Sequence, residues 1–196
     1  MPIDDKVAEL SQRLEALEDR GAIRDVIERY SRGLDRGDTD VMRAIFWPDA
    51  TFPLGPPTGP ATEFIEVMFG GYVGEVLISA AHLLGNSTIE IEGARASAET
   101  YAIAHHRTWP TAASNDAVIG PGNYKPEDAG KEHSLILGFR YLDLFEKREG
   151  EWRILERRLV FDWSQSGLYQ GIEEGGLYEG TPLRGVRSRE DPCYAR

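Results

Sequence analysis

The chain has 196 residues, of which 41% are hydrophobic and 28% charged, a composition typical of one folded domain. Its net charge of −11 disfavours binding to nucleic acid or to an anionic membrane surface, and no run of Lys and Arg supplies a basic patch. The single cysteine, Cys193, excludes an internal disulfide and a cysteine-ligated metal centre. Because the first twenty residues also lack the apolar run of a signal peptide, we expect a cytoplasmic protein.

Two amphipathic helices are predicted at the start of the chain. The second follows Gly21, keeps apolar residues at i, i+3, i+4 and i+7, and ends near Asp35. The first carries a narrow stripe at heptad-like spacing, which consists of Val7, Leu10, Leu14 and Leu17.

The next segment predicts short elements separated by proline and glycine. Asp38 is a suitable cap for a third helix, which Pro48 terminates because the residue before proline is excluded from the helical region. Residues 49–54 read as a short strand and 53–60 as a turn-rich loop. A helix is expected over 61–77, although it contains three glycines.

From His82 onward the hydrophobic period changes to two, which predicts β-strands. A glycine in the segment REGE favours a tight hairpin between the last two strands. The loop over 110–132 is too long for a plain connection, so we expect it to be functional or disordered. Helices followed by antiparallel strands predict an α+β domain over 1–163, with a tail over 164–196. The predicted strands span 82–93, 94–109, 133–148 and 151–163.

Three polar residues near the predicted helix and strand boundaries are candidates for chemistry. His82 opens a strand after two alanines that leave room for an imidazole, and Asp35 closes the second helix. Tyr30 lies on the apolar stripe, where its hydroxyl needs one partner. A capping histidine, a solvated helix-end aspartate and a core tyrosine are the commoner explanations, so these spacings alone identify no enzyme.

Arg157 is expected to be buried in the last strand. Strict alternation places it among apolar side chains, where a guanidinium must be paired or must face an anion. A structural ion pair is the commoner arrangement, and a ligand contact is the alternative. The residues that alternation places on its face are Leu155, Leu159, Phe161 and Trp163.

The adjacent residues His105 and His106 point to opposite faces of their strand, so they cannot both serve one site. Small alanines share a face with His106 and would leave space for a ligand, which makes it the better candidate; close helix packing is the alternative. No closely spaced His and carboxylate set predicts a metal, and the GxSxG, P-loop and GxGxxG motifs are absent. We therefore expect neither a metal site nor a nucleotide site.

Four segments in this order resemble SnoaL-like members of the nuclear transport factor 2-like superfamily. They are AIRDVIERYSRGLD, WPDATF, AAHLLGNSTIEI and FEKREGEWRILERRLVF, and the match spans roughly residues 10 to 163. The pattern is similar to scytalone dehydratase, bile-acid 7α-dehydratase and gamma-hexachlorocyclohexane dehydrochlorinase. The resemblance implies a cystatin-like, cone-shaped α+β barrel with helices packed on a curved sheet. The long 110–132 segment and the tail depart from the minimal pattern, so the resemblance does not determine the shape of the pocket entrance.

The resemblance also implies roles for the candidate residues. In these lyases an aspartate at the end of an early helix pairs with a histidine at the start of a strand, and Asp35 and His82 occupy the matching positions. Tyr30 matches a tyrosine of the bile-acid dehydratase, and Arg157 matches an arginine of the dehydrochlorinase that would orient the substrate or fix Asp35. His106 matches the second histidine of scytalone dehydratase.

The resemblance implies a cofactor-independent carbon–oxygen lyase, with dehydratase-like elimination from a small cyclic, aromatic or steroid-like substrate in an apolar pocket. It also implies a homo-oligomer, with a trimer favoured, and the acidic surface and apolar stripe of the first helix suggest self-association as well. The fold also hosts other functions. A ketosteroid-isomerase-like enzyme, a retro-aldol lyase and a non-catalytic subunit like that of ring-hydroxylating dioxygenases are the alternatives, and the last predicts a filled cone and a separated dyad.

Overall fold

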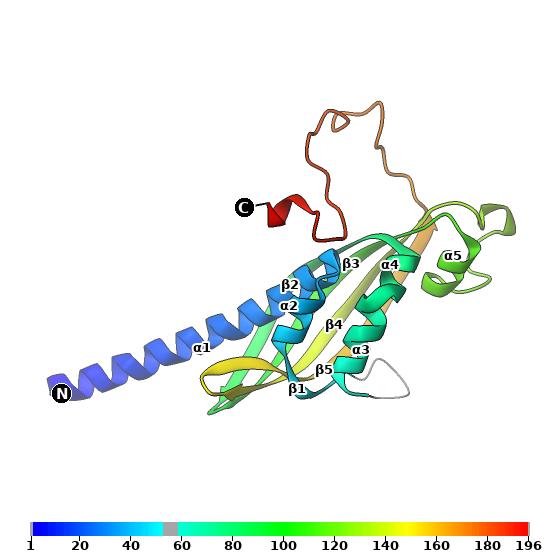
Figure 1. Ribbon diagram of the computed structural model, residues 1–196. Helices are drawn as coiled ribbons and strands as arrows, with labels where there is room; N and C mark the ends of the chain where they lie inside the picture. Colours follow the sequence, from blue (N-terminus) through cyan, green and yellow to red (C-terminus); the bar gives the residue numbers. More distant parts are fainter. Residues whose placement is uncertain (1, 53–58, 196) are drawn as a thin grey trace.

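The computed structural model describes residues 2–52 and 59–195 and contains a five-stranded mixed sheet with helices on one face (Figure 1). The sheet is curved and does not close into a barrel, and it confirms the predicted α+β class. The strand order is β1-β5-β4-β3-β2, in which β1 runs parallel to β5 and the other neighbours are antiparallel. The strands are β1 (Phe46–Thr51), β2 (Leu77–Glu92), β3 (Arg95–Thr108), β4 (His133–Arg148) and β5 (Glu151–Leu168).

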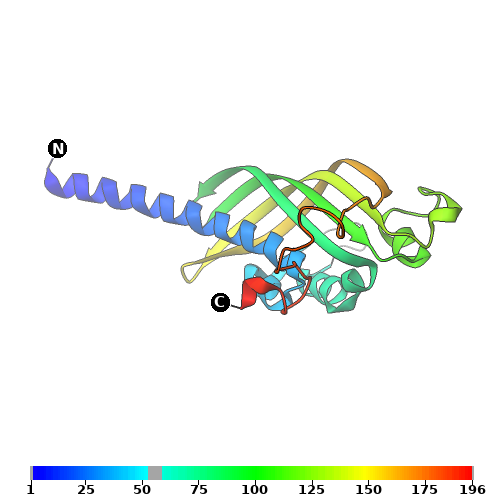
Figure 2. The same ribbon diagram turned by 90° about the horizontal axis from the view of Figure 1, so that it is seen from above.

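The N-terminal region forms one continuous helix, α1 (Ile3–Arg36), so the prediction of two helices separated at Gly21 was wrong. One glycine costs a helix interior only about 1 kcal/mol, which the backbone hydrogen bonds on either side outweigh. Buried residues begin at Ile23, and the preceding half of α1 extends away from the sheet (Figures 1 and 2). The second half packs against the sheet, and Gly37 ends the helix in the left-handed conformation at φ 62°.

Helix α2 (Thr39–Ile45) begins as predicted, with Asp38 accepting a hydrogen bond from the backbone N–H of Val41 at 3.2 Å. It ends earlier than predicted because the chain is already extended at Phe46, where β1 begins. The strand expected over 49–54 is therefore shifted toward the N-terminus. The predicted loop at 53–60 lies mostly outside the described residues.

The helix predicted over 61–77 is interrupted. It consists of α3 (Ala61–Val67), a π-helical turn (Met68–Tyr72) and α4 (Val73–Val76), and the backbone leaves helical geometry at Gly71. These short helices lie beside α1 on the same face of the sheet (Figure 1).

The segment over 110–132 is folded, which excludes the disordered alternative for the part beyond β3. It contains α5 (Ala112–Val118) and a short 3₁₀ turn (Pro126–Asp128). The buried amide of Asn115 organises it, because its Oδ1 accepts from the Thr108 hydroxyl at 2.6 Å and its Nδ2 donates to the carbonyls of Ala129 and Lys131 at 2.9 and 3.0 Å.

Two strands are longer than the sequence pattern predicts. β2 begins at Leu77 rather than at His82, so His82 lies within the strand, and β5 continues to Leu168 rather than ending at residue 163. The tight hairpin between β4 and β5 is confirmed, with Glu149 and Gly150 at φ 53° and 86°. No helix among residues 2–52 and 59–195 is long and apolar enough to cross a membrane.

Strict alternation fails in β5. The pairing of β4 with β5 shifts at two places, between Leu144 and Phe145 and between Gly138 and Phe139. Arg157 is buried as expected, but the first shift puts Ile154 instead of Leu155 on its side of the sheet, so Ile154 is buried and Leu155 lines a hollow on the opposite face. Phe161 stays in register with Phe139, and Phe161 and Trp163 are 58% and 48% exposed. A bulge inserts one residue into a strand and changes which side chains face the core.

The tail after Leu168 returns to the end of α1 (Figure 2). The Tyr194 hydroxyl donates to Asp38 at 2.5 Å, and the carboxylate of Asp191 lies 3.2 Å from Nε of Arg36. Arg189 also pairs with Asp38, at 3.0 Å. The tail is therefore attached to the junction between α1 and α2.

Candidate active site

Asp35 and His82 form a closely paired dyad. Nδ1 of His82 lies 2.6 Å from Oδ1 of Asp35, and the backbone N–H of His82 donates to Oδ2 of the same carboxylate at 3.1 Å. Their side chains are only 7% and 15% exposed. Because both carboxylate oxygens contact one residue, the imidazole is held in a fixed orientation with Nε2 as its remaining nitrogen.

Fold positions explain why these two side chains meet. Asp35 lies in the last turn of α1, just before the left-handed Gly37 ends the helix, and α1 packs across β2. His82 lies within β2, two residues after the buried Ala80, and the side chains of Ala80 and His82 line the same cavity.

The dyad histidine borders an apolar cavity of about 300 Å³ between the helices and the sheet. Side chains from α1, α3, α4 and α5 form one wall, and β2 to β5 form the other. Because its lining is mostly hydrocarbon, the cavity suits an apolar ligand and strengthens electrostatic interactions inside it. Its apolar lining includes Leu34, Phe64, Val76, Leu135, Phe139 and Leu159.

His106 lies beside His82 in this cavity. It pairs in register with Ala80, and the two imidazole rings are 5.6 Å apart. Burial, with a smaller contribution from the neighbouring His82, lowers the pKa of His106 to about 3, so this imidazole is neutral at physiological pH. The prediction that the two adjacent histidines face opposite ways is confirmed, since His105 is absent from the cavity lining and lies near Tyr169.

Tyr30 lines the cavity from α1 and is 2% exposed. Its ring packs edge-on against Tyr141, with 5.3 Å between centroids. Burial raises the pKa of Tyr30 to about 12, although the nearby Arg157 opposes the shift. The hydroxyl therefore keeps its proton at neutral pH and is available as a donor.

Arg157 forms a buried ion pair rather than a contact with Asp35. Its Nε and Nη2 donate to the two carboxylate oxygens of Asp143, each at 2.6 Å, and both side chains are fully buried. The guanidinium stacks 3.8 Å from the ring centroid of Tyr30, and it is not among the residues that line the cavity. The structural ion pair expected from the strand pattern is thus present. Arg157 packs against the ring of Tyr30 without lining the cavity itself.

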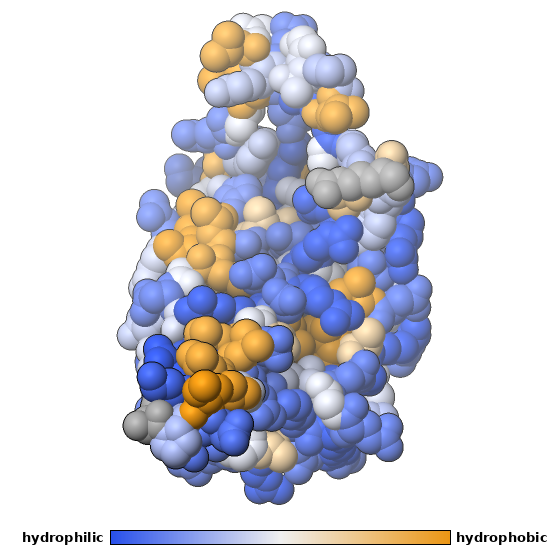
Figure 3. Space-filling view, turned by 90° about the vertical axis from the view of Figure 1, so that its left-hand side faces the viewer, coloured by the Kyte–Doolittle hydropathy of each residue, from blue (hydrophilic) through white to orange (hydrophobic). Residues whose placement is uncertain are grey.

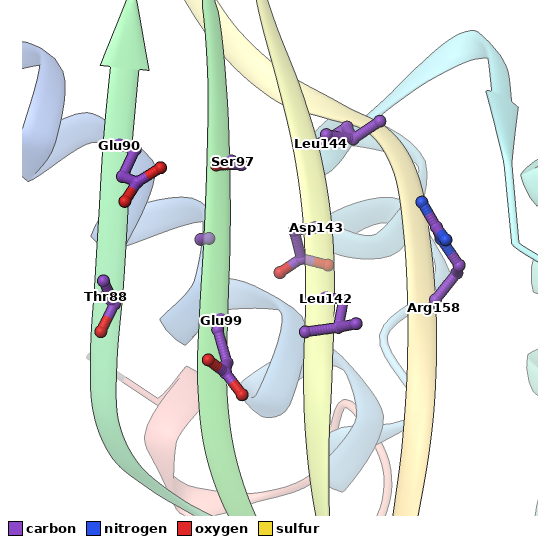
Figure 4. Close-up of a pocket in the computed structure, with 9 residues that line it drawn as sticks. Thr88, Glu90, Ser97, Glu99, Leu142, Asp143, Leu144 and Arg158 are labelled. Carbon is purple, nitrogen blue, oxygen red and sulfur yellow. The ribbon is translucent and has the colours of Figure 1, made fainter.

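A second hollow, of about 260 Å³, lies over strands β2 to β5, and three acidic residues line it: Glu90, Glu99 and Asp143, the partner of Arg157 (Figure 4). Glu90 and Glu99 project there beside Ser97, and Glu99 pairs with Arg140 at 2.8 Å. This hollow contains no histidine and none of the dyad atoms, so we place the candidate active site in the apolar cavity. Within the described part of the chain, no three His, Cys, Asp or Glu side chains gather as metal ligands.

Sequence reasoning missed Arg187, which the tail brings close to the dyad. One guanidinium nitrogen lies 3.2 Å from where a Cβ on Gly37 would stand and 3.7 Å from the same position on Gly74. The charge of Arg187 acts on both Asp35 and His106. No sequence signal points to this residue, because the tail has no periodicity and the contact depends on the path of the returning chain.

The fold and the cavity define a class of protein: an α+β domain in which helices cover one face of a curved sheet and enclose a histidine–aspartate pair. Residues 15–158 match the sequence profile described as the SnoaL-like domain. The chain belongs to the SnoaL-like domain family. No curated protein matches the chain by sequence.

Solved structures support the fold. A type 2 hexachlorocyclohexane dehydrochlorinase (LinA) superposes with a TM-score of 0.66 at 16% identity, covering 84% of this chain and 99% of that one. A protein provisionally named scytalone dehydratase from Novosphingobium aromaticivorans gives 0.58 at 19% identity, with 80% and 91% covered. An NTF2-like protein with a cystatin-like fold from the same organism gives 0.57 at 23% identity, with 82% and 92% covered. At these identities the likeness establishes the fold.

Proposed function

We propose that this chain is a cofactor-independent carbon–oxygen lyase that eliminates water from a small cyclic or aromatic substrate. The observation that carries the proposal is the 2.6 Å contact between Asp35 and His82 at the border of an apolar cavity. A base oriented by a carboxylate and placed at an apolar pocket is suited to proton abstraction. The family's dehydratase and dehydrochlorinase structures make elimination the working reaction.

Each step uses a residue in a stated position. Nε2 of His82 takes a proton from a substrate carbon, while Asp35 holds the Nδ1 proton and stabilises the imidazolium. A carbon–carbon double bond forms as the carbon–oxygen bond breaks, and the imidazolium returns its proton to the leaving hydroxide to give water. Tyr30, which keeps its proton at neutral pH, donates a hydrogen bond to developing negative charge on a substrate oxygen.

The two histidines receive different roles in this scheme. A side chain whose pKa is about 3 carries no extra proton to give at neutral pH, so His106 is an unsuitable acid for the leaving group. We assign the return of the proton to His82 and a hydrogen-bonding, orienting role to His106.

The non-catalytic alternative requires a filled cone and a separated dyad. The hydrogen-bonded pair and the cavity of about 300 Å³ favour an enzyme instead. Isomerase and retro-aldol chemistry would use the same base, and the identity of the product separates them from elimination.

The test is turnover of a panel of hydroxylated aromatic and alicyclic compounds, followed by mass spectrometry. We expect loss of water from at least one compound, and His82→Ala should lower its kcat by about 10²- to 10⁴-fold with little change in thermal stability. His105→Ala, which alters the neighbouring strand outside the cavity, is the matched control and should retain activity. Undiminished turnover by His82→Ala would remove the dyad from the mechanism, and an isomer or a released aldehyde would replace elimination.

A further inference from the structure

Strand β4 provides a scale for position along the apolar cavity. Alternate residues of this strand line the cavity, so each successive pair marks one row of the sheet. His106 pairs in register with Leu135, and Ala104 lies between Leu137 and His82 in the next row. His106 is therefore one row from His82, with 5.6 Å between the ring centroids. The β4 residues that line the cavity are Leu135, Leu137, Phe139 and Tyr141.

The Tyr141 end of this series is closed. Tyr30 packs edge-on against Tyr141, with 5.3 Å between ring centroids, and Phe52 stacks beside Tyr30 at 6.3 Å. All three residues line the cavity, and they are at most 4% exposed. Because they leave almost no surface to solvent, this end provides no route for a ligand.

The Leu135 end is open. Helix α4 leads into β2 at Leu77 and α5 follows β3, so both helices lie at the end of the sheet where His106 pairs with Leu135 (Figure 1). Tyr72, directly before α4, and Ala117 of α5 both line the cavity, and both are exposed, Tyr72 by 44%. A residue that lines a cavity and also contacts solvent borders its entrance. The entrance therefore lies between α4 and α5.

Hydrogen bonds from Trp109 hold α4 at this entrance. The indole N–H of Trp109 donates to the carbonyl of Gly74 at 3.0 Å, and its backbone N–H donates to the carbonyl of Val76 at 3.3 Å. Trp109 directly follows β3, so these bonds attach α4 to the end of the sheet. The backbone that precedes β2 and carries Tyr72 is thus fixed relative to the cavity.

The distance from the dyad to the entrance is longer than one ring. Leu77 lines the cavity next to α4 and precedes His82 by five residues, which correspond to about 15 Å of strand. A single six-membered ring beside His82 covers less than half of this length. A substrate that fills the cavity up to the entrance therefore needs a second apolar part.

The ring of Tyr72 is available to that second part. Phe52 and Phe64 stack with 4.1 Å between centroids, and Phe69 packs edge-on against Phe64. Within the described residues, Tyr72 joins no such aromatic pair. It ends the π-helical turn that begins at Met68, and turns of this kind occur frequently at functional sites. A half-exposed aromatic ring at the entrance offers contact area to an apolar group of a ligand.

We propose that Tyr72 binds an apolar substituent of the substrate, so that the enzyme acts on a cyclic or aromatic alcohol that carries a hydrocarbon chain. The reacting ring lies beside His82, and the chain extends past His106 to the entrance. This inference rests on the proposed acid/base function and adds the part of the substrate that determines its selection. Tyr72 is a specificity-determining residue and takes no part in proton transfer.

The experiment is calorimetric titration of the full-length protein with phenol and 4-butylphenol. Wild type should bind 4-butylphenol at least about tenfold more tightly than phenol, because the chain gains apolar contact. Tyr72→Ala should weaken 4-butylphenol binding by about fivefold or more and change phenol binding by less than about twofold, because phenol does not reach the entrance. Tyr72→Phe keeps the ring and should bind 4-butylphenol within about twofold of wild type.

Tyr101→Ala is the matched control. Tyr101 is 47% exposed but lines a groove on the opposite face of the sheet, so this variant should bind both phenols as wild type does. Unchanged phenol binding by Tyr72→Ala shows that this variant is folded.

Four outcomes would overturn the proposal. They are 4-butylphenol binding by Tyr72→Ala that equals wild type, equal weakening of both phenols by Tyr72→Ala, a loss in Tyr72→Phe as large as in Tyr72→Ala, and a wild type that does not prefer 4-butylphenol. Binding is measured without turnover. A protein that binds both phenols as expected but releases water from no substrate therefore overturns only the lyase proposal.

Discussion

The two histidines of the cavity differ in their immediate partners. His82 has a carboxylate at 2.6 Å, whereas His106 has no hydrogen-bonded carboxylate among the described residues and pairs across the sheet with Ala80 and Leu135. Desolvation therefore dominates at His106 and keeps it neutral. The cavity therefore contains one base, the His82 imidazole paired with Asp35, and beside it the neutral His106 imidazole, which is suited to hydrogen bonding.

His106 should make the fold sensitive to acid. Its pKa is lowered from 6.5 to about 3 in the folded chain, so between these values the unfolded chain binds a proton that the folded chain does not. Stability due to this group is complete above the unfolded value and is lost as the pH falls below it, by at most about 1.4 kcal/mol per pH unit. His106→Gln removes the effect.

Urea unfolding at about pH 7 and about pH 5 measures this difference. On acidification, wild type should lose about 2 kcal/mol more of its free energy of unfolding than His106→Gln does. Equal losses in the two proteins would show that His106 titrates normally in the fold.

At the scale of elements, the continuity of α1 sets the position of Asp35. Gly21 lies in the exposed part of a regular helix, and an added Cβ meets no atom within 4 Å. Gly37 has a left-handed backbone at φ 62° and lies against Arg187. The helix could therefore accept a side chain at Gly21, whereas the backbone conformation at Gly37 favours glycine.

Substitution of these glycines by alanine should change stability in opposite directions. Gly21→Ala should raise the free energy of unfolding by about 0.5 to 1 kcal/mol, because alanine reduces the entropy of the unfolded chain and favours the helix. Gly37→Ala should lower it by about 1 kcal/mol or more, because alanine is strained at positive φ. Thermal unfolding measures both variants, and a destabilised Gly21→Ala would indicate that the helix is broken in solution.

At the scale of the whole molecule, apolar side chains remain on the surface. Figure 3 looks toward the side of the N-terminus and shows several apolar groups separated by hydrophilic residues. An exposed stripe on a helix that extends from the domain is suited to association with another copy. We propose a homo-oligomer, for which the family resemblance favours a trimer. The α1 stripe consists of Val7, Leu10, Leu14 and Leu17, which are 56%, 61%, 57% and 67% exposed.

Sedimentation tests this assembly. Wild type should sediment as a trimer, and Leu14→Lys should shift the population toward smaller species, since burying a lysine in an apolar contact is unfavourable. Gln12→Lys adds the same charge to a polar, exposed position of the same helix and should leave the assembly unchanged. A wild-type protein that is only monomeric would contradict the proposal.

Local patterns in the sequence determined much of the architecture. Periodicity placed most of the strands, turn chemistry predicted the hairpin at Glu149 and Gly150, and alternation separated His105 from His106. These features depend on backbone preferences over a few neighbouring residues, which are written in the local sequence. The same rules predicted a break at Gly21 and strict alternation around Arg157. Both predictions failed, because the backbone hydrogen bonds of the helix outweigh the cost of a single glycine and because a bulge beside Arg157 changes the register.

Only the tertiary structure decided which distant residues meet. Asp35 and His82 are 47 residues apart, and their pairing was expected from family resemblance rather than from any local pattern. Asp143 as the partner of Arg157, and Arg187 beside the cavity, were not foreseen, because each contact depends on strand register or on the path of the tail. Hydrogen bonds and ion pairs form only between side chains within a few ångströms of each other. Residues far apart in the chain therefore form a shared site only when the sheet, the helices and the tail are assembled.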